Sequence, residues 1–207
     1  MKKYDMIVIG LGPAGMAASI MGSAMGFKVC AIERHQIGGE CTNVGCLPSK
    51  GILKFAATNP TCPTAFSEVR ERVRTAREEQ LEPMFKKIHT IKGVASFVNE
   101  NTILIDGEKI VAKKIFVAVG TRPMVPPIPG LSDIDYLTND NIFSLDKAPA
   151  SMVILGGGMI GTEMALAFHR LGCKCTIVQN DAHLIPAGEK EAAELLEKKY
   201  KEYGIDI

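Results

Sequence analysis

The first part of the chain alternates short apolar runs with a stretch of small residues. Residues 4–9 form an apolar run typical of a buried strand, and residues 16–25 have the composition of a helix. A second apolar run covers residues 28–32. This order predicts strand, turn, helix and a second strand, which is the repeating unit of doubly wound α/β proteins.

The turn before the helix has the sequence GLGPAG at residues 10–15. Gly10 permits a tight turn, Gly12 lets a pyrophosphate approach the backbone, and Gly15 lets the helix pack closely on the strand. The helix N-terminus then faces the phosphates. Glu33 follows the second strand at about 20 residues past the glycines, where a carboxylate can bind ribose hydroxyls. Together these features predict a dinucleotide site.

The same pattern recurs downstream. A strand is predicted over 152–155, the turn GGGMIG covers 156–161, and a helix is predicted over 162–171. After a further strand at 175–178, Gln179 occupies the ribose position. Glutamine can donate and accept hydrogen bonds but lacks the charge that repels a 2′-phosphate, and no arginine follows it to clamp one. A second dinucleotide is therefore predicted, with NAD favoured and NADP possible.

The segment between the two patterns is predicted to form a charged helix and a small antiparallel sheet. Residues 66–88 are rich in Glu and Arg, which predicts an exposed helix pair supported by i,i+4 charges and broken or kinked at Pro83. The β-rich runs that follow predict an antiparallel meander and then one more strand. They cover residues 91–98, 102–105 and 109–111 for the meander and 114–119 for the strand. We expect a domain boundary near Ala150, which divides the chain into two domains, residues 1–150 and residues 151–207.

Composition excludes several function classes. The 207 residues are 46% hydrophobic, which is enough for a substantial core, and the formal net charge of +1 gives no field that selects nucleic acid or an anionic membrane. No apolar run approaches the roughly 18 residues of a membrane helix, and the N-terminus has no signal-peptide pattern. We therefore expect a cytoplasmic protein with neither nucleic acid nor membrane as a partner.

Cys41 and Cys46 are the two cysteines whose positions suggest chemistry. On an ideal helix, Cα atoms five residues apart are separated by about 8.6 Å. A disulfide needs less than about 7 Å. The pair can therefore bond only if the segment bends, and glycines at 38, 39 and 45 permit a bend. A helix beginning near Gly45 would put Cys46 in or near its first turn, where amide N–H groups favour a thiolate.

The alternative for this pair is a structural or metal-binding role. Zinc needs a fuller ligand set than the nearby His35 would supply, so no metal site is predicted. The other cysteines are interpreted as small buried or neutral side chains. They are Cys30, Cys62, Cys173 and Cys175.

The order of these motifs resembles the flavin disulfide reductases, which include dihydrolipoamide dehydrogenase, glutathione reductase and mercuric reductase. The resemblance covers essentially the whole chain, although residues 51–91 are shorter than is usual. It implies an α/β fold with a Rossmann-like FAD-binding domain and a small antiparallel meander, followed by the start of a Rossmann-like NAD(P)-binding domain. The matching features are the GxGxxG at 10–15, Glu33, the GGxCxNxGCxPSK signature at 38–50, the turn at 118–123, and the GxGxxG at 156–161 with Glu163 behind it.

The resemblance implies that electrons pass between NAD(P)H and a dithiol or disulfide through FAD and a Cys41–Cys46 redox disulfide. In this pattern Cys46 is the flavin-proximal thiol, and Cys41 exchanges with the substrate. Lys50 would pair with Glu163 near the flavin, where a positive charge stabilises the reduced form. Met159 either covers the nicotinamide pocket or fills a gap in the core. The expected cofactor-binding residues are Gly10, Gly12, Pro13, Ala14, Gly15, Glu33, Gly39, Cys41, Lys50, Gly120, Gly156, Gly158, Ile160, Gly161 and Gln179.

Within the family, residues 184–187 look most like dihydrolipoamide dehydrogenases, and a mercuric or glutathione reductase type is the alternative. The expected substrate is a small-molecule or lipoyl-protein disulfide, and the full-length protein is expected to be a homodimer. The family's catalytic His-Glu pair has no counterpart here, so none of the four histidines is assigned to catalysis.

We therefore expect a fragment of a longer enzyme that turns over poorly or not at all by itself. A half-built parallel sheet in the second domain would expose apolar faces on the strand at 152–155. A flavin- or nucleotide-binding module without complete catalysis, or one completed by a separate chain, is the alternative.

Overall fold

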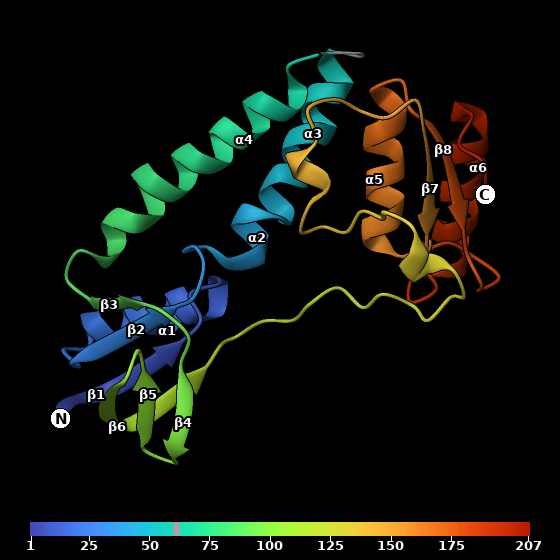
Figure 1. The fold of residues 1–207 in the computed structure, drawn as a ribbon. Coiled ribbons are helices and arrows are strands. Elements are labelled where there is room, and N and C mark those ends of the chain that lie inside the picture. Colours follow the sequence, from blue (N-terminus) through green and yellow to red (C-terminus); the bar gives the residue numbers. More distant parts are fainter. Residues whose placement is uncertain (60–62) are drawn as a thin grey trace. The chain divides into compact units, whose positions relative to one another are not determined.

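The computed structural model describes residues 1–59 and 63–207, so Cys62 lies outside the described residues. The chain divides into two compact units (Figure 1). Unit 1 comprises Met1–Leu47 and Glu71–Ile142, and unit 2 comprises Pro48–Arg70 and Phe143–Ile207. The division of the chain at residue 150 stays a prediction.

Unit 1 is built on a six-stranded mixed sheet with the order β3-β2-β1-β6-β5-β4. β1 pairs in parallel with β2 and β6, and β2 pairs in parallel with β3. β4, β5 and β6 form the antiparallel part. The strands are β1 (Lys2–Ile9), β2 (Val29–Glu33), β3 (His89–Lys92), β4 (Ser96–Asn99), β5 (Thr102–Ile105) and β6 (Glu108–Val117).

Two details of the predicted meander are wrong. The runs at 109–111 and 114–119 belong to one long strand, β6. The charged residue between the two runs, Lys113, does not interrupt the strand, because its Nζ donates to Asp5 Oδ1 of the paired strand β1 at 2.8 Å. The start of the first run belongs to β3, which pairs in parallel with β2 rather than with β4. Parallel pairing joins residues far apart in sequence, so a local pattern does not reveal it.

Both faces of the parallel part of the sheet are buried. Ile7 of β1 belongs to one apolar cluster with Cys30 and Ile110, whereas the adjacent Val8 belongs to a second cluster with Phe85. Successive residues of a strand point to opposite faces, so a strand buried on both sides is apolar throughout. This explains why residues 4–9 are a continuous apolar run.

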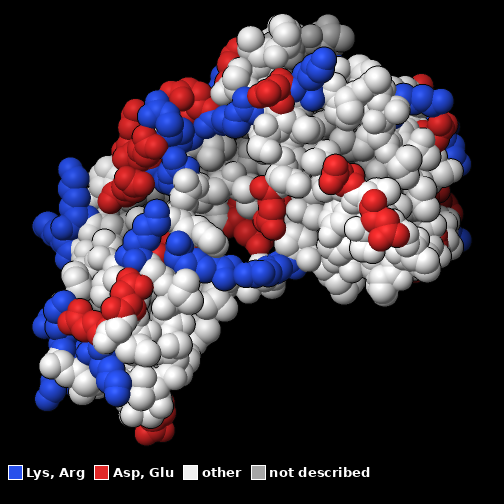
Figure 2. Space-filling model, in the orientation of Figure 1, with Lys and Arg blue, Asp and Glu red and all other residues white. Residues whose placement is uncertain are grey.

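The charged segment is more irregular than predicted and ends at Phe85 rather than at residue 88. α4 (Ala65–Thr75) continues into a π-helical turn (Ala76–Leu81) and a 3₁₀ turn (Glu82–Phe85). Pro83 lies in that 3₁₀ turn, which confirms the predicted break. Figure 2 shows both signs of charge gathered over α4, and Arg74 forms ion pairs with Glu71 and Glu78. The helix also has an apolar side, on which Phe66 is fully buried.

Unit 2 contains a two-stranded parallel sheet, β7 (Ser151–Leu155) and β8 (Lys174–Val178). Ile154 contacts α5, since a Cβ on Gly161 would meet its side chain. The other face of the sheet is exposed, with Val153 64% and Val178 52% accessible. This confirms the predicted exposed apolar face.

The helices of the chain are α1 (Pro13–Ala24), α2 (Gly39–Asn43), α3 (Cys46–Thr58), α4, α5 (Met159–Arg170) and α6 (Lys190–Tyr203), with short 3₁₀ turns at Leu131–Asp133 and Ile142–Ser144. In the described part of the chain, none of these helices combines the length and the apolar character needed to cross a membrane.

Candidate functional site

The glycine turn of unit 1 has the geometry that its sequence predicts. Gly10 has a φ of 92°, and its N–H donates to the Ile32 carbonyl at 2.8 Å. A Cβ on Gly15 would fall on the Gly10 carbonyl oxygen, well inside the 3.0 Å below which real Cβ contacts essentially never fall. A Cβ on Gly12 would meet only the Gly39 Cα, at 3.8 Å. Gly10 and Gly15 are therefore required by the fold, whereas Gly12 leaves the backbone open to a ligand.

Glu33 ends β2 and is held beside this turn by the backbone. Its Oε2 accepts from the Leu11 N–H at 2.7 Å, and its Oε1 accepts from the His35 N–H at 2.8 Å. An ionised carboxylate has about four acceptor positions, so two remain for ligand hydroxyls. The carboxylate is thus anchored beside the glycine turn, and its binding of a ribose stays a prediction.

A cavity of about 1090 Å³ opens at this edge of unit 1. Its volume is at the upper end for ligand pockets. Cys41 contributes to its lining together with the glycine turn, the end of β2 and the turn after β6. With the exception of Gly15, every unit 1 residue predicted to bind FAD lines this cavity: Gly10, Gly12, Pro13, Ala14, Glu33, Gly39, Cys41 and Gly120.

Sequence reasoning missed several other residues of this cavity. Arg34 and Arg122 supply two guanidinium groups that suit phosphate oxygens, and residues 93–95 form part of the wall. The Gly93 N–H donates to the Glu33 carbonyl at 2.9 Å, so this loop is tied to the end of β2. No local sequence signal identifies this loop, because it reaches the cavity through the parallel pairing of β3, which brings the carboxyl end of that strand to the same sheet edge.

The segment with the two cysteines is bent, as predicted. Cys41 lies in the short helix α2, which the sequence did not predict, and Cys46 is the first residue of α3, as predicted. A Cβ on Gly45 would approach the Glu40 carbonyl oxygen to 2.8 Å, so a glycine is needed where the chain turns between the helices. The N–H of Gly38 donates to the Leu11 carbonyl at 2.8 Å, which connects this segment to the glycine turn.

The other described cysteines are buried, as predicted. Cys30, Cys173 and Cys175 are at most 1% exposed. Burial raises the pKa of the Cys30 thiol to about 11 and that of the Cys175 thiol to about 12. These thiols are protonated at neutral pH, and the thiolate is the reactive form. Chemical reactivity is therefore expected at Cys41 and Cys46 rather than at these three.

Unit 2 repeats the glycine geometry. Gly156 has a φ of 102° and donates to the Val178 carbonyl at 2.8 Å. The Gly157 N–H donates to the Gln179 Oε1 at 3.0 Å, with the same separation of 22 residues as between Leu11 and Glu33. Gly161 would clash with the Gly156 carbonyl if it carried a Cβ.

The same turn leaves its outer side open. A Cβ on Gly158 would meet nothing within 4 Å. Ile160 is 69% exposed and Met159 is 75% exposed at the start of α5. The interpretation of Met159 as a core side chain is therefore wrong, and its position at the mouth of the turn is compatible with covering a ligand.

Lys50 and Glu163 form an ion pair within unit 2. Lys50 Nζ donates to Glu163 Oε2 at 2.5 Å. The other carboxylate oxygen of Glu163 is buried and has no hydrogen-bond partner in the part of the chain that the structure describes. The predicted pairing is thus present, and its role beside a flavin stays a prediction.

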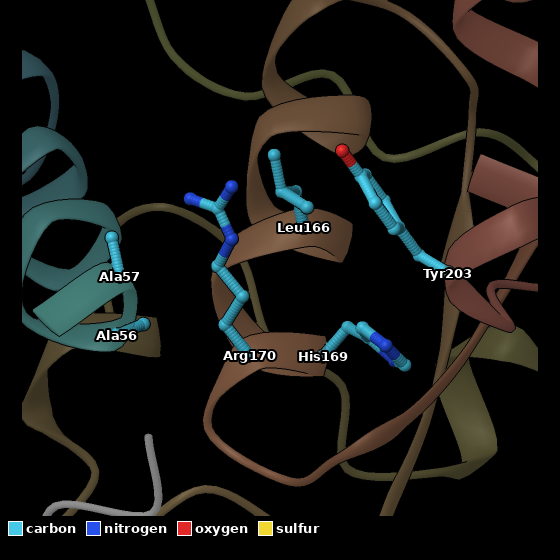
Figure 3. Close-up of a pocket in the computed structure, with 6 residues that line it drawn as sticks. All are labelled: Ala56, Ala57, Leu166, His169, Arg170 and Tyr203. Carbon is cyan, nitrogen blue, oxygen red and sulfur yellow. The ribbon is translucent and has the colours of Figure 1, made fainter. Parts of the chain in front are cut away.

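A second cavity, of about 470 Å³, lies on unit 2 (Figure 3). It is lined by Leu166, His169 and Arg170 of α5, Tyr203 of α6, and Ala56 and Ala57 of α3. None of the predicted site residues is among these six. Over residues 1–59 and 63–207, no group of three His, Cys, Asp or Glu residues is arranged to hold a metal ion.

The sequence and fold were compared with known proteins. The family model described as "Pyridine nucleotide-disulphide oxidoreductase" matches residues 4–207. Mercuric reductase from Bacillus cereus is 34% identical over 99% of this chain and 35% of its own length. Dihydrolipoyl dehydrogenase from Bacillus subtilis (strain 168) is 32% identical over 98% of this chain and 49% of its own length.

Among solved structures, the HOCl-induced flavoprotein disulfide reductase RclA from Escherichia coli matches with a TM-score of 0.90 and 30% identity. The match covers 99% of this chain and 48% of that protein. The fold is therefore the α/β fold predicted from the sequence, with a Rossmann-like FAD-binding domain.

The chain belongs to the pyridine nucleotide-disulphide oxidoreductase family. Members of this family use FAD and NAD(P)H, in agreement with the two glycine turns. The relatives include both mercuric reductases and dihydrolipoyl dehydrogenases, and the chain spans 35% and 49% of the lengths of the two named above.

Proposed function

We propose that this chain carries the flavin-binding and redox-cysteine part of an NAD(P)H-dependent disulfide oxidoreductase, most like dihydrolipoamide dehydrogenase. The observation that supports this best is that Cys41, Gly12 and Glu33 line one cavity. Bound FAD would exchange a hydride with the nicotinamide and two electrons with a Cys41–Cys46 disulfide. Overall, NADH and one proton would reduce the disulfide to two thiols and leave NAD⁺.

The residues of unit 1 fit FAD. α1 has no acidic residue in its first turn, so its N-terminus at Gly12 favours phosphate oxygens. Arg34 and Arg122 add positive charge to the same cavity, and Glu33 keeps free acceptor positions for the ribose. The chain's own contribution is thus to hold the cofactor beside the Cys41 segment.

In unit 2 we assign the turn from Gly156 to Gly161 to the nicotinamide dinucleotide. Gln179 Nε2 donates to the Asp181 carboxylate and the His183 carbonyl, and its Oε1 accepts from the Gly157 N–H. Gln179 would therefore bind a ribose hydroxyl through the second acceptor position of Oε1. The Asp181 carboxylate would oppose a 2′-phosphate electrostatically. These features favour NAD.

We also propose which member of the family this protein is. Residues 184–187 favour the dihydrolipoamide enzyme, which would oxidise a lipoyl dithiol or, in the reverse direction, reduce a lipoyl disulfide. A mercuric reductase type is the second candidate, because the Bacillus cereus relative is 34% identical. Oxidation of dihydrolipoamide and reduction of Hg²⁺, measured side by side on the full-length protein, would separate the two. We further propose that the full-length protein is a cytoplasmic homodimer.

Anaerobic addition of NADH to the FAD-loaded chain tests whether the chain carries the flavin and redox-cysteine part of a disulfide oxidoreductase. We expect a slow change of the flavin spectrum, with a long-wavelength band that is lost in Cys46→Ser. A binding module without redox function would bind FAD and show neither change. Steady-state turnover at rates typical of enzymes would contradict the expectation that this chain alone is a poor catalyst.

A further inference from the structure

Arg77 is a charged side chain with little exposure on an otherwise solvated segment. Its side chain is 15% exposed, whereas that of the neighbouring Arg74 is 49% exposed. It lies in the π-helical turn Ala76–Leu81, an irregularity that occurs frequently at functional sites. The predicted role of this segment, an exposed scaffold, therefore does not describe Arg77.

The guanidinium of Arg77 reaches back to the segment around Cys41, on both sides of this cysteine. Its Nη1 donates to Gln36 Oε1 at 3.0 Å and to Asn43 Oδ1 at 3.1 Å. Its Nη2 donates to Glu78 Oε1 at 3.0 Å, so the charge is balanced locally. Hydrogen bonds from a charged donor are stronger than neutral ones, and a guanidinium fixes their directions.

Asn43 passes this constraint to the backbone around Cys41. Its Nδ2 donates to the Ile37 carbonyl at 3.1 Å and to the Gly39 carbonyl at 2.9 Å. Because Arg77 can only donate, it holds the amide of Asn43 with the oxygen outward and the NH₂ group toward those two carbonyls. The residues before and at the start of α2 are therefore tied to the residue at its end.

Arg74 offers an internal comparison on the same stretch of chain. Its guanidinium pairs with Glu71 and Glu78, within one turn of its own helix. Its described partners therefore all lie on its own helical segment, whereas those of Arg77 include a segment 34 to 41 residues away in sequence. The two arginines are thus chemically alike but differently connected.

We propose that Arg77, acting through Asn43, is the positioning residue that fixes the α2 turn and thereby holds Cys41 in place for disulfide exchange with Cys46. This inference rests on the proposed redox role of the two cysteines. A fixed turn raises the effective concentration of one thiol at the other, which favours ring closure to the disulfide. Loosening the turn therefore shifts the equilibrium toward the dithiol.

The experiment measures the dithiol–disulfide equilibrium of the chain in buffers of reduced and oxidised glutathione. In this reaction Cys41 and Cys46 together lose two electrons and two protons, and one glutathione disulfide gains both and becomes two glutathione thiols. The oxidised fraction is read by alkylation and peptide mass spectrometry. We expect the equilibrium constant to fall by about tenfold in Arg77→Gln, the size of one lost charged hydrogen bond.

Arg74→Gln is the matched control and should leave the equilibrium constant unchanged. Asn43→Ala should reproduce the effect of Arg77→Gln, and Arg77→Lys should restore part of it, because lysine keeps the charge but not the fork. Hydrogen exchange adds a local readout: the amides of Thr42 and Val44, which donate to the Gly38 and Glu40 carbonyls, should exchange faster in Arg77→Gln and in Asn43→Ala but not in Arg74→Gln.

Two results would overturn the proposal while leaving the proposed function intact. One is an equilibrium constant in Arg77→Gln and Asn43→Ala equal to that of the unsubstituted chain. The other is an equal shift of the equilibrium constant in the Arg74→Gln control, which would show that the shift arises from a loss of positive charge or of overall stability. If the unsubstituted chain forms no Cys41–Cys46 disulfide in any glutathione buffer, the proposed function itself fails.

Discussion

The two glycines that surround the N-terminus of α1 should respond to alanine in opposite ways. In Gly15→Ala the new Cβ would fall on the Gly10 carbonyl oxygen, a backbone atom that cannot rotate away. In Gly12→Ala the new Cβ would make an ordinary contact of 3.8 Å with Gly39. Gly12 has a φ of −70° and a ψ of −176°, which any residue adopts. The first substitution should therefore affect folding and the second should affect the ligand.

The magnitudes follow from these distances. Overpacking costs about 1–3 kcal/mol when side chains can move, and here the backbone of the turn has to move. The gain in helix propensity offsets at most about 1 kcal/mol. We expect Gly15→Ala to lose about 2–3 kcal/mol of unfolding free energy. Gly12→Ala should stay within about 1 kcal/mol of the unsubstituted chain but bind FAD at least about tenfold more weakly, because its methyl group stands in the way of the pyrophosphate.

Urea unfolding followed by circular dichroism measures the first quantity, and FAD fluorescence titration measures the second. The same pair of experiments applies to unit 2 with NAD, where Gly161→Ala corresponds to Gly15→Ala and Gly158→Ala to Gly12→Ala. A Gly15→Ala chain as stable as the unsubstituted one would refute the packing argument. A Gly12→Ala chain with unchanged FAD affinity would refute the assignment of the turn to the pyrophosphate.

Three further predictions concern single side chains. Ile177→Ala should cost about 2–4 kcal/mol in urea unfolding because the side chain is 1% exposed, whereas Val178→Ala, 52% exposed, should cost less than about 1 kcal/mol; equal losses would contradict the one-sided packing of the sheet. Because burial raises the pKa of Cys30 from 9.0 to about 11, the unfolded chain ionises first, so stability should fall as pH rises from about 9 to 11. The urea midpoint of Cys30→Ala should fall less over that pH range than the midpoint of the unsubstituted chain. An equal fall in both proteins would show that ionisation of Cys30 is not the cause. Gln179→Glu keeps an acceptor for the Gly157 amide and adds a charge, so calorimetry should show NADP losing about tenfold more affinity than NAD; an equal loss for both would place the ribose elsewhere.

Local patterns were sufficient for the parts of the fold that are local. The βαβ order around Gly10 and Gly156, the placement of Glu33 and Gln179 beside the glycine turns, and the start of a helix at Cys46 all follow from residues close together in sequence. Each depends on backbone geometry that only certain residue types permit, so the residue types themselves indicate the geometry.

The parts that could not be predicted depend on contacts between distant residues. β3 joins the parallel sheet through pairing with β2, and residues 93–95 reach the cavity only as a consequence. Arg77 looked like one more charge on a solvated helix, because its partner Asn43 is 34 residues away. Such contacts are set by how the elements pack, and neither periodicity nor composition reports them.

The central claim is that Cys41 and Cys46 form a redox centre in electronic contact with the flavin of the same chain. The most direct measurement is an anaerobic dithionite titration of the FAD-loaded chain, counting the electrons needed to bleach the flavin completely. FAD accepts two electrons and a disulfide accepts two more. The account predicts four electrons per FAD for the unsubstituted chain and two for Cys46→Ser, whereas two for both proteins would contradict it.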